Sequence, residues 1–181
     1  MLILAALIVA GGALWLYRRA TSPPTLPQGP AAGLSTEDAG ARAFEMVGTQ
    51  RHLEAIPYFR RVVTLDPGSW LAHENLASAL GNGAQQARTL LGKDDIATRS
   101  SVERVAMMRE SIAETEVAEW LAPGPEGRVM SLFERARALE TWGFPLDALV
   151  RFRAAAALAP GRADIAEALR RAERELATGA P

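Results

Sequence analysis

One unbroken apolar stretch near the amino terminus constrains this chain more than any other feature. Residues 2–17 contain no charged or strongly polar side chain, and Arg18 and Arg19 follow directly. A helix that spans a bilayer needs about 20 apolar residues, with a range of roughly 17–25, and arginine stems that reach back to the interface extend the apolar length. We therefore expect residues 1–19 to form a single transmembrane anchor, with residues 2–17 in the lipid bilayer.

The end of this stretch has the residue types that lie at a membrane surface. Trp15 and Tyr17 suit the headgroup level, and Arg18 and Arg19 suit the adjoining water. The positive-inside tendency places the arginine pair, and with it the rest of the chain, in the cytoplasm, while a periplasmic orientation is the alternative. The arginine- and alanine-rich composition suggests a bacterium, so the expected location is a bacterial inner (cell) membrane, crossed once.

A cleaved secretory signal peptide is the competing interpretation of the same stretch. No basic residue precedes the apolar run, and no small-x-small cleavage site follows it directly. Both features are expected of signal peptides, so the pattern favours a retained anchor.

Residues 20–35 are expected to form a proline-rich linker. Four prolines interrupt this segment and remove backbone donors, which excludes a continuous helix and favours an extended, semi-rigid spacer. The pair Pro24 and Pro27 also fits a PxxP recognition motif, but such matches are frequent by chance in linkers.

Everything after the linker is predicted to be helical. Apolar residues recur at helical spacing, β-branched residues are sparse, and no strand-like alternation of convincing length is present. The fold class is therefore all-α for residues 36–181. Glycine and proline breaks give the expected helices as about 36–48, 52–65, 70–80, 84–91, 101–121, 127–142, 145–158 and 163–176.

Three serines are predicted to cap helices. Ser35 precedes the first helix, with Asp38 at the third helical position, and Ser69 precedes the third. Ser100, with Glu103, is predicted to begin the helix over 101–121. The sequence Gly81-Asn82-Gly83 is predicted to end the helix that starts at Trp70, because glycine is unfavourable in a helix interior.

Two segments echo each other, EAIPYFRRVVTLDPG from Glu54 and DALVRFRAAAALAPG from Asp147. The echo matches a small residue, an aromatic residue and a closing proline: Ala55 with Ala148, Phe59 with Phe152, Pro67 with Pro160. The preceding helices match as well, at Ala43 and Ala136. A small residue lets the two helices of a hairpin cross closely, the aromatic ring fills the next turn, and the proline releases the chain for another hairpin.

This pattern resembles the tetratricopeptide repeat (TPR), a helix–turn–helix unit of about 34 residues. The resemblance implies a right-handed solenoid of helix hairpins. Its units would be about 36–69, 70–124 and 129–162, followed by an end helix over 163–177 of the kind that closes such arrays. The middle unit departs from the family pattern, since Thr89, Lys93 and Ile96 stand where small, aromatic and small residues are expected. It is therefore either a degenerate unit with an insertion or a family-specific departure.

In the family, the first helices of successive units line a concave groove where partners bind. The resemblance therefore implies a partner-binding surface, with these candidate residues: Phe44, Leu71, Glu74, Met130, Phe133 and Arg137. The paired lysines and asparagines with which the family clamps carboxylate-terminated chaperone tails are missing here. The simpler interpretation of Phe44, Met130 and Phe133 is that they pack between helices.

Motifs of catalysis and cofactor binding are missing from the sequence. There is no cysteine, no phosphate-binding glycine loop and no nucleophile with a base nearby. His52 and His73 lack the spacing of metal ligands and are expected to be partly exposed helix residues. The formal net charge of −1 gives no field that would attract nucleic acid. We predict no enzyme, no cofactor, no metal, no small-molecule substrate and no nucleic-acid partner.

Two functions fit an anchor, a spacer and a helical interaction domain. The first is a non-catalytic scaffold, an accessory structural subunit of a multi-subunit membrane complex, for example a respiratory or photosynthetic one. The second is a membrane-anchored assembly or biogenesis factor that recruits clients transiently through its groove. In both cases the predicted partners are other proteins.

Overall fold

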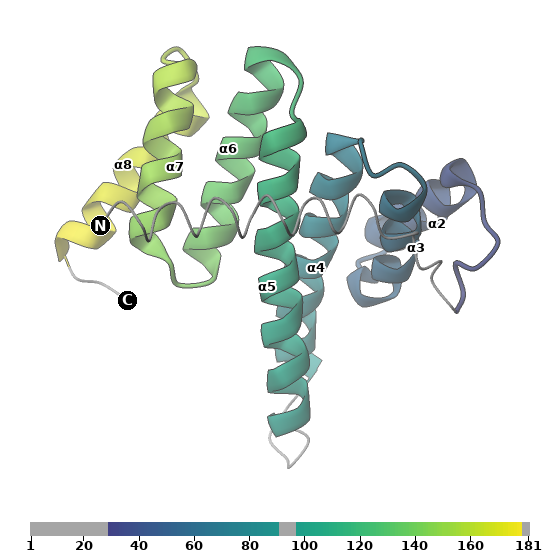
Figure 1. Ribbon diagram of the computed structural model, residues 1–181. Helices are drawn as coiled ribbons and strands as arrows, with labels where there is room; N and C mark the ends of the chain where they lie inside the picture. Colours follow the sequence, from purple (N-terminus) through teal and green to yellow (C-terminus); the bar gives the residue numbers. More distant parts are fainter. Residues whose placement is uncertain (1–28, 91–96, 179–181) are drawn as a thin grey trace, which may run out of the picture.

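The computed structural model describes residues 29–90 and 97–178, and within those ranges every regular element is an α-helix (Figure 1). The predicted all-α class is confirmed for this part of the chain. The helices are α2 (Thr36–Gly48), α3 (His52–Leu65), α4 (Trp70–Leu90), α5 (Ala97–Leu121), α6 (Gly124–Thr141), α7 (Pro145–Leu158) and α8 (Ala163–Thr178).

The expected anchor over 1–19, with Trp15, Tyr17, Arg18 and Arg19, lies outside the described residues. So does the expected linker up to residue 28. None of the helices that the structure does describe has the length and apolar character to cross a membrane.

Each helix packs against its neighbours along the chain, from α2 against α3 to α7 against α8 (Figure 1). The result is a row of helical hairpins, the arrangement that the repeated segments predict. The small residues expected at the helix crossings, Ala43, Ala55, Ala136 and Ala148, are fully buried. A larger side chain at any of these four positions would push two helix axes apart.

The aromatic positions of the repeat organise two apolar clusters. Phe59 belongs to the amino-terminal cluster with Leu76 and Leu80, and Phe152 belongs to the carboxyl-terminal one. Phe59 meets Phe44 edge to face, with ring centroids 5.4 Å apart. In each of the two units that follow the family pattern, the core is thus filled by the aromatic ring that the two repeated segments share.

Gly81-Asn82-Gly83 does not end a helix, and this prediction is wrong. α4 continues through the glycines to Leu90. A β-carbon at position 83 would lie 3.1 Å from Ile56 Cδ1, so Gly83 lets α4 approach α3 closely. Gln86 then secures the last part of the helix, because it accepts a hydrogen bond from the Leu53 N–H at 3.2 Å and donates one to the Gln50 carbonyl at 2.9 Å.

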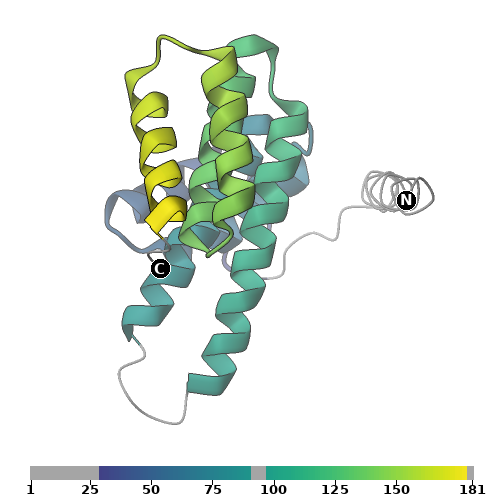
Figure 2. The same ribbon diagram turned by 90° about the vertical axis from the view of Figure 1, so that its left-hand side faces the viewer.

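The middle unit is one long hairpin of α4 and α5, which extends beyond the ends of the other helices (Figures 1 and 2). α5 begins at Ala97, so Ser100 lies inside the helix and its predicted capping role is wrong. The other two caps are confirmed, because Ser35 Oγ accepts from the Asp38 N–H at 3.1 Å and Ser69 Oγ accepts from the Ala72 N–H at 3.3 Å.

The expectation that His73 is partly exposed is also wrong, since only 2% of its surface is accessible. Its Nδ1 atom lies 2.5 Å from Glu114 Oε2 on α5, and its Nε2 atom lies 3.1 Å from the Pro67 carbonyl oxygen. A buried ionisable side chain needs such partners, since burying it without them costs several kcal/mol. This contact joins the two helices of the long hairpin.

Candidate binding groove

A hollow of about 160 Å³ opens between α4, α5 and α6. α4 and α6 form its walls and α5 forms its floor. α4 and α6 are the first helices of the second and third units, which the family resemblance expects to line the concave face. The lining residues are Glu74, Ala77, Ser78, Gly81, Asn82 and Gln85 of α4, Ser111 and Thr115 of α5, and Glu134, Arg137, Ala138, Thr141 and Trp142 at the end of α6.

The hydroxyl groups on the floor of this groove are already hydrogen-bonded to the backbone. Ser111 Oγ donates to the Ala77 carbonyl at 2.8 Å, and Thr115 Oγ1 donates to the Ile112 carbonyl at 2.7 Å. Both hydroxyl protons are therefore committed to backbone oxygens. Gly81 adds depth, because a β-carbon there would meet only Ser111 Oγ, at 3.6 Å.

Glu74 is the most perturbed acid of the groove. Burial raises its pKa to about 7, the Ser131 hydroxyl acts in the opposite direction, and the nearby Glu134 carboxylate raises the pKa further. Glu74 Oε1 is covered from solvent. Neither this atom nor the buried Ser131 Oγ meets the geometry of a hydrogen bond, although Ser131 lies close enough to favour the ionised form of Glu74. This end of the groove thus holds a carboxylate whose charge is poorly stabilised by the protein itself.

The other two charges at this end partly balance each other. Arg137 Nη1 lies 3.3 Å from both oxygens of Glu134, one helical turn away on α6. The Arg137 side chain is 58% exposed, so the pair contributes little to stability and both groups can rotate toward a ligand. With Glu74 ionised, the three side chains carry a net charge of −1.

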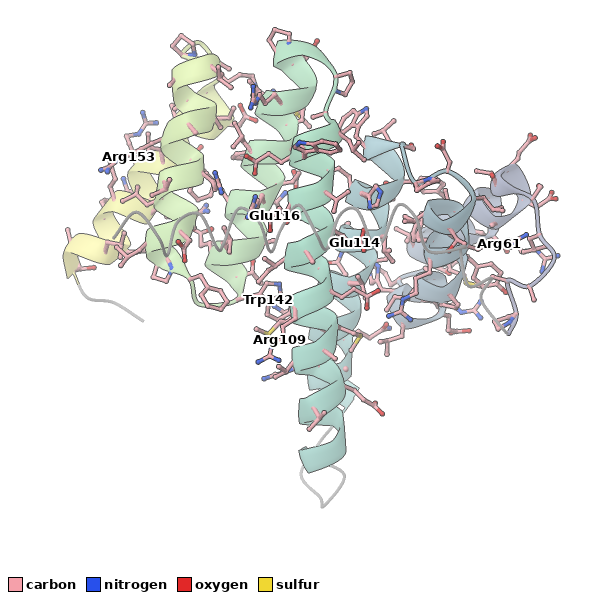
Figure 3. The ribbon with its side chains drawn as sticks, viewed as in Figure 1. Arg61, Arg109, Glu114, Glu116, Trp142 and Arg153 are labelled. Atoms are coloured by element: carbon pink, nitrogen blue, oxygen red, sulfur yellow. The ribbon has the colours of Figure 1, made fainter. Side chains whose placement is uncertain are left out.

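The opposite end of the groove is neutral and carries an aromatic ring. Trp142 follows the last residue of α6 (Figure 3) and is half-buried. Gln85 and Asn82 face it from α4, and Asn82 Nδ2 donates weakly to Ser78 Oγ at 3.4 Å. From Glu74 to Gln85 the groove spans roughly 16 Å at 1.5 Å per residue, which is about the length of five residues of an extended peptide.

An ion-pair network holds the wall formed by α6 in place. Arg135 points away from the groove and lies 2.7 Å from Glu119 of α5, which also lies 3.6 Å from Arg151 of α7. Arg135 and Glu119 are mostly buried, and a charge-assisted contact of this kind fixes helix position more firmly than an exposed pair does. The width of the groove is therefore set by contacts behind it.

The structure brings two of the six predicted partner-binding residues into the groove, Glu74 and Arg137. Leu71 and Phe44 lie outside it and are exposed, at 53% and 55%. Phe133 is half-buried and packs on Phe152 with ring centroids 5.8 Å apart, in the manner of a core residue. Met130 is also half-buried, and its sulfur accepts from Arg162 Nη1 at 3.7 Å. A binding role for these residues stays a prediction.

The lining residues that sequence reasoning missed come mainly from two places. Asn82 was assigned to a break and Gln85 to a separate short helix over 84–91, because the helix was expected to stop at Gly81. Trp142 was counted only as a helix end, and Ser111 and Thr115 belong to the unit that departs from the family pattern. The absence of proline between Trp70 and Leu90 was the available signal that α4 could continue.

No group of three or more histidine, aspartate or glutamate side chains within 29–90 and 97–178 is arranged to hold a metal ion. Asp164 is the other strongly shifted acid: its contact with the Arg162 guanidinium lowers its pKa to about 2. That pair is exposed at the start of α8 and lies outside the groove.

No family model and no curated protein matches the sequence. Among solved structures, the chain is similar to the first TPR of Spaghetti (RPAP3) bound to the HSP90 peptide SRMEEVD. The TM-score is 0.56 at 15% identity, and the match covers 81% of this chain and 98% of that one. At this identity the likeness shows the fold alone, and it supports a TPR-like array of helices.

Proposed function

We propose that this protein is a non-catalytic interaction module that binds a segment of another protein in the groove between α4 and α6. The observation that carries the proposal is the open hollow between the first helices of two successive units. Its length suits an extended peptide. The similar solved structure, which has a bound peptide, adds support for this use of the fold.

The chemistry of the groove supports binding over catalysis. A hydrolytic site needs a nucleophile that hydrogen-bonds to a base. Here the Ser111 and Thr115 hydroxyls donate to backbone carbonyls. His73, which could act as a base, is buried against Glu114 on the far side of α4 from solvent.

The ligand we propose differs in charge from the peptide in the similar structure. SRMEEVD has three acidic residues and one arginine. The groove presents Glu74 and Glu134 against the single cation Arg137, so an acidic tail would meet repulsion. We therefore propose that the partner segment is not an acidic tail.

We further propose that residues 2–17 anchor this module in a bacterial inner membrane, as an accessory structural subunit of a multi-subunit membrane complex. The uninterrupted apolar run and its flanking Trp15, Tyr17, Arg18 and Arg19 support the anchor. The alternative is a membrane-anchored assembly factor that binds clients transiently through the same groove.

Purification in a mild detergent separates these two roles. A structural subunit co-purifies with its complex in a fixed ratio, whereas an assembly factor is recovered free or in substoichiometric amounts. Before solubilisation, the full chain is expected in the membrane fraction after a carbonate wash. Recovery of the full chain in the washed supernatant would overturn the anchor.

Selection from a displayed library of random twelve-residue peptides tests the groove. We expect the full chain, in non-ionic detergent, to enrich peptides that the Ser78→Trp variant no longer binds, because an indole at this exposed position fills the groove. Glu167→Trp, on α8 away from the groove, is the matched control and should keep binding. Circular dichroism confirms that both variants fold. The absence of enriched peptides, or equal binding by Ser78→Trp, would reject the groove as a binding site.

A further inference from the structure

The geometry points to a more specific ligand, and this inference rests on the proposed function. We infer that the end of the groove formed by Glu74 and Glu134 receives a cationic side chain, a lysine or an arginine, of the partner segment. The cation would lie between α4 and α6 against the carboxylate of Glu74. The remaining residues of the segment would extend toward Trp142.

The first argument is the unmet hydrogen-bonding capacity of Glu74. Its Oε1 atom is covered from solvent with no donor in hydrogen-bond geometry, and the Ser131 hydroxyl, which lies near enough to lower the pKa of Glu74, does not meet that geometry either. Buried polar atoms are almost always paired in folded proteins, so each exception needs an explanation. A donor supplied by a bound ligand would satisfy Oε1 of Glu74, a residue that lines the hollow. Lysine and arginine provide several donors together with the opposite charge.

The second argument is that no side chain in the described part of the chain fills this role. No described cation forms an ion pair with Glu74, and Arg137, the one cation lining the hollow, is paired with Glu134 at 3.3 Å. By contrast, Glu114 on the adjacent floor helix has His73 at 2.5 Å. The protein therefore partners the buried Glu114 internally and leaves the partly buried Glu74 facing the hollow.

The third argument is size. A volume of about 150 Å³ is enough to hold a benzene molecule. The whole hollow measures about 160 Å³, so it has room for one guanidinium or ammonium group with part of its stem, while the rest of the segment would lie along its open side. A bare divalent ion is a poorer fit, because Glu74 and Glu134 supply too few oxygen ligands and no metal-holding group is found among the described residues.

This site would make binding sensitive to pH. Among the described residues, the charged groups near Glu74 are Glu134 and Arg137 of α6, which line the same hollow. His73 is next to it on α4 and is paired with Glu114 of α5. Because burial raises the pKa of Glu74 to about 7, the carboxylate must lose its proton to bind the cation. Its ionised fraction falls from about nine-tenths at pH 8 to about one-tenth at pH 6, which lowers affinity about tenfold.

The peptide library that tests the groove also tests this inference. We expect peptides enriched by the full chain to share a lysine or arginine at one position. Glu74→Gln should lose that preference, whereas Glu167→Gln, which removes one negative charge from the exposed face of α8, should keep it. For a histidine-free member of the enriched pool, fluorescence anisotropy should show affinity about tenfold lower at pH 6 than at pH 8. The Glu74→Gln variant should show no such change.

The outcomes separate the two proposals. Peptides that require an open groove but carry no shared basic residue, or that bind Glu74→Gln as tightly as the wild type at pH 8, would overturn the cationic site and leave the peptide groove standing. If no peptide is enriched, the groove itself is rejected, and the cationic site with it. Replacement of the shared lysine or arginine by norleucine should lower affinity at pH 8 and abolish the pH dependence.

Discussion

His73 Nδ1 lies 2.5 Å from Glu114 Oε2, with both side chains about 2% exposed. The second ring nitrogen of His73 lies 3.1 Å from the carbonyl oxygen of Pro67, in the turn between α3 and α4. One imidazole thus connects three parts of the chain: the turn that ends the first unit and both helices of the second. Figure 3 shows Glu114 on the side of α5 that faces α4.

Replacement of His73 by alanine should destabilise the protein by about 3–5 kcal/mol, because the Glu114 carboxylate would remain buried without this partner. The double variant His73→Leu/Glu114→Leu should lose much less than the sum of the losses of His73→Leu and Glu114→Leu, since no charge is then buried without a partner. Urea denaturation of the four proteins measures the coupling. Additive losses would show that the pair is not coupled.

Replacement of Glu74 by glutamine should stabilise the protein at pH 8 and leave it unchanged near pH 4.5. The folded protein holds this carboxyl at a pKa of about 7, against 4.5 in the unfolded chain, so it binds more protons between these values. The free energy of unfolding of the wild type therefore falls as pH rises from about 4.5 to about 7, by roughly 1–3 kcal/mol from this group. Urea titrations of both proteins from pH 4.5 to pH 8 measure the difference. A constant difference across this range would contradict the prediction.

The two glycines within α4 should respond differently to alanine. Gly81→Ala should raise the free energy of unfolding by about 0.5–1 kcal/mol, because helix propensity improves and the added carbon meets only Ser111 Oγ, at 3.6 Å. Gly83→Ala should gain less or lose stability, since its added carbon would lie 3.1 Å and 3.2 Å from Ile56 Cδ1 and Leu53 Cδ2. Thermal melts rank the two variants, and the reverse order would contradict the packing of α4 on α3.

Leucine at Ala136 should cost about 1–3 kcal/mol, because this fully buried position lies where α6 crosses α7 and has no room for a larger side chain. Leucine at Ala41, on the exposed face of α2, is the matched control and should change stability by less than about 0.5 kcal/mol. Chemical denaturation compares them. Equal losses would mean that the crossing is not closely packed.

Much of the helical array could be predicted because its signals are local. Ser35 and Ser69 begin helices by accepting hydrogen bonds from nearby backbone N–H groups. Pro67 and Pro160 follow the second helix of each repeated hairpin. Ala55, Phe59, Ala148 and Phe152 could be assigned to the interior because the two segments repeat the same pattern. These features depend on residues within a few positions of each other.

The groove could be predicted only in part. Glu74 and Arg137 followed from the family resemblance, but the length of α4 depends on contacts with α3 and α5. Gln86 hydrogen-bonds to residues more than 30 positions away. A window of sequence around Gly81 shows two glycines and predicts a break, while the tertiary contacts of Gly83 and Gln86 stabilise the continuous helix.

The sequence by itself determined the helical class, the hairpin repeat and the apolar stretch over 2–17, because each depends on residue type and short-range spacing. Only the tertiary structure decided that His73 is buried against Glu114, while Glu74 faces a hollow and forms no ion pair with any described cation. Both acids lie in the middle hairpin, and no pattern in the sequence distinguishes them. What separates them is the packing of distant helices, because burial and partners set the free energy of a charge.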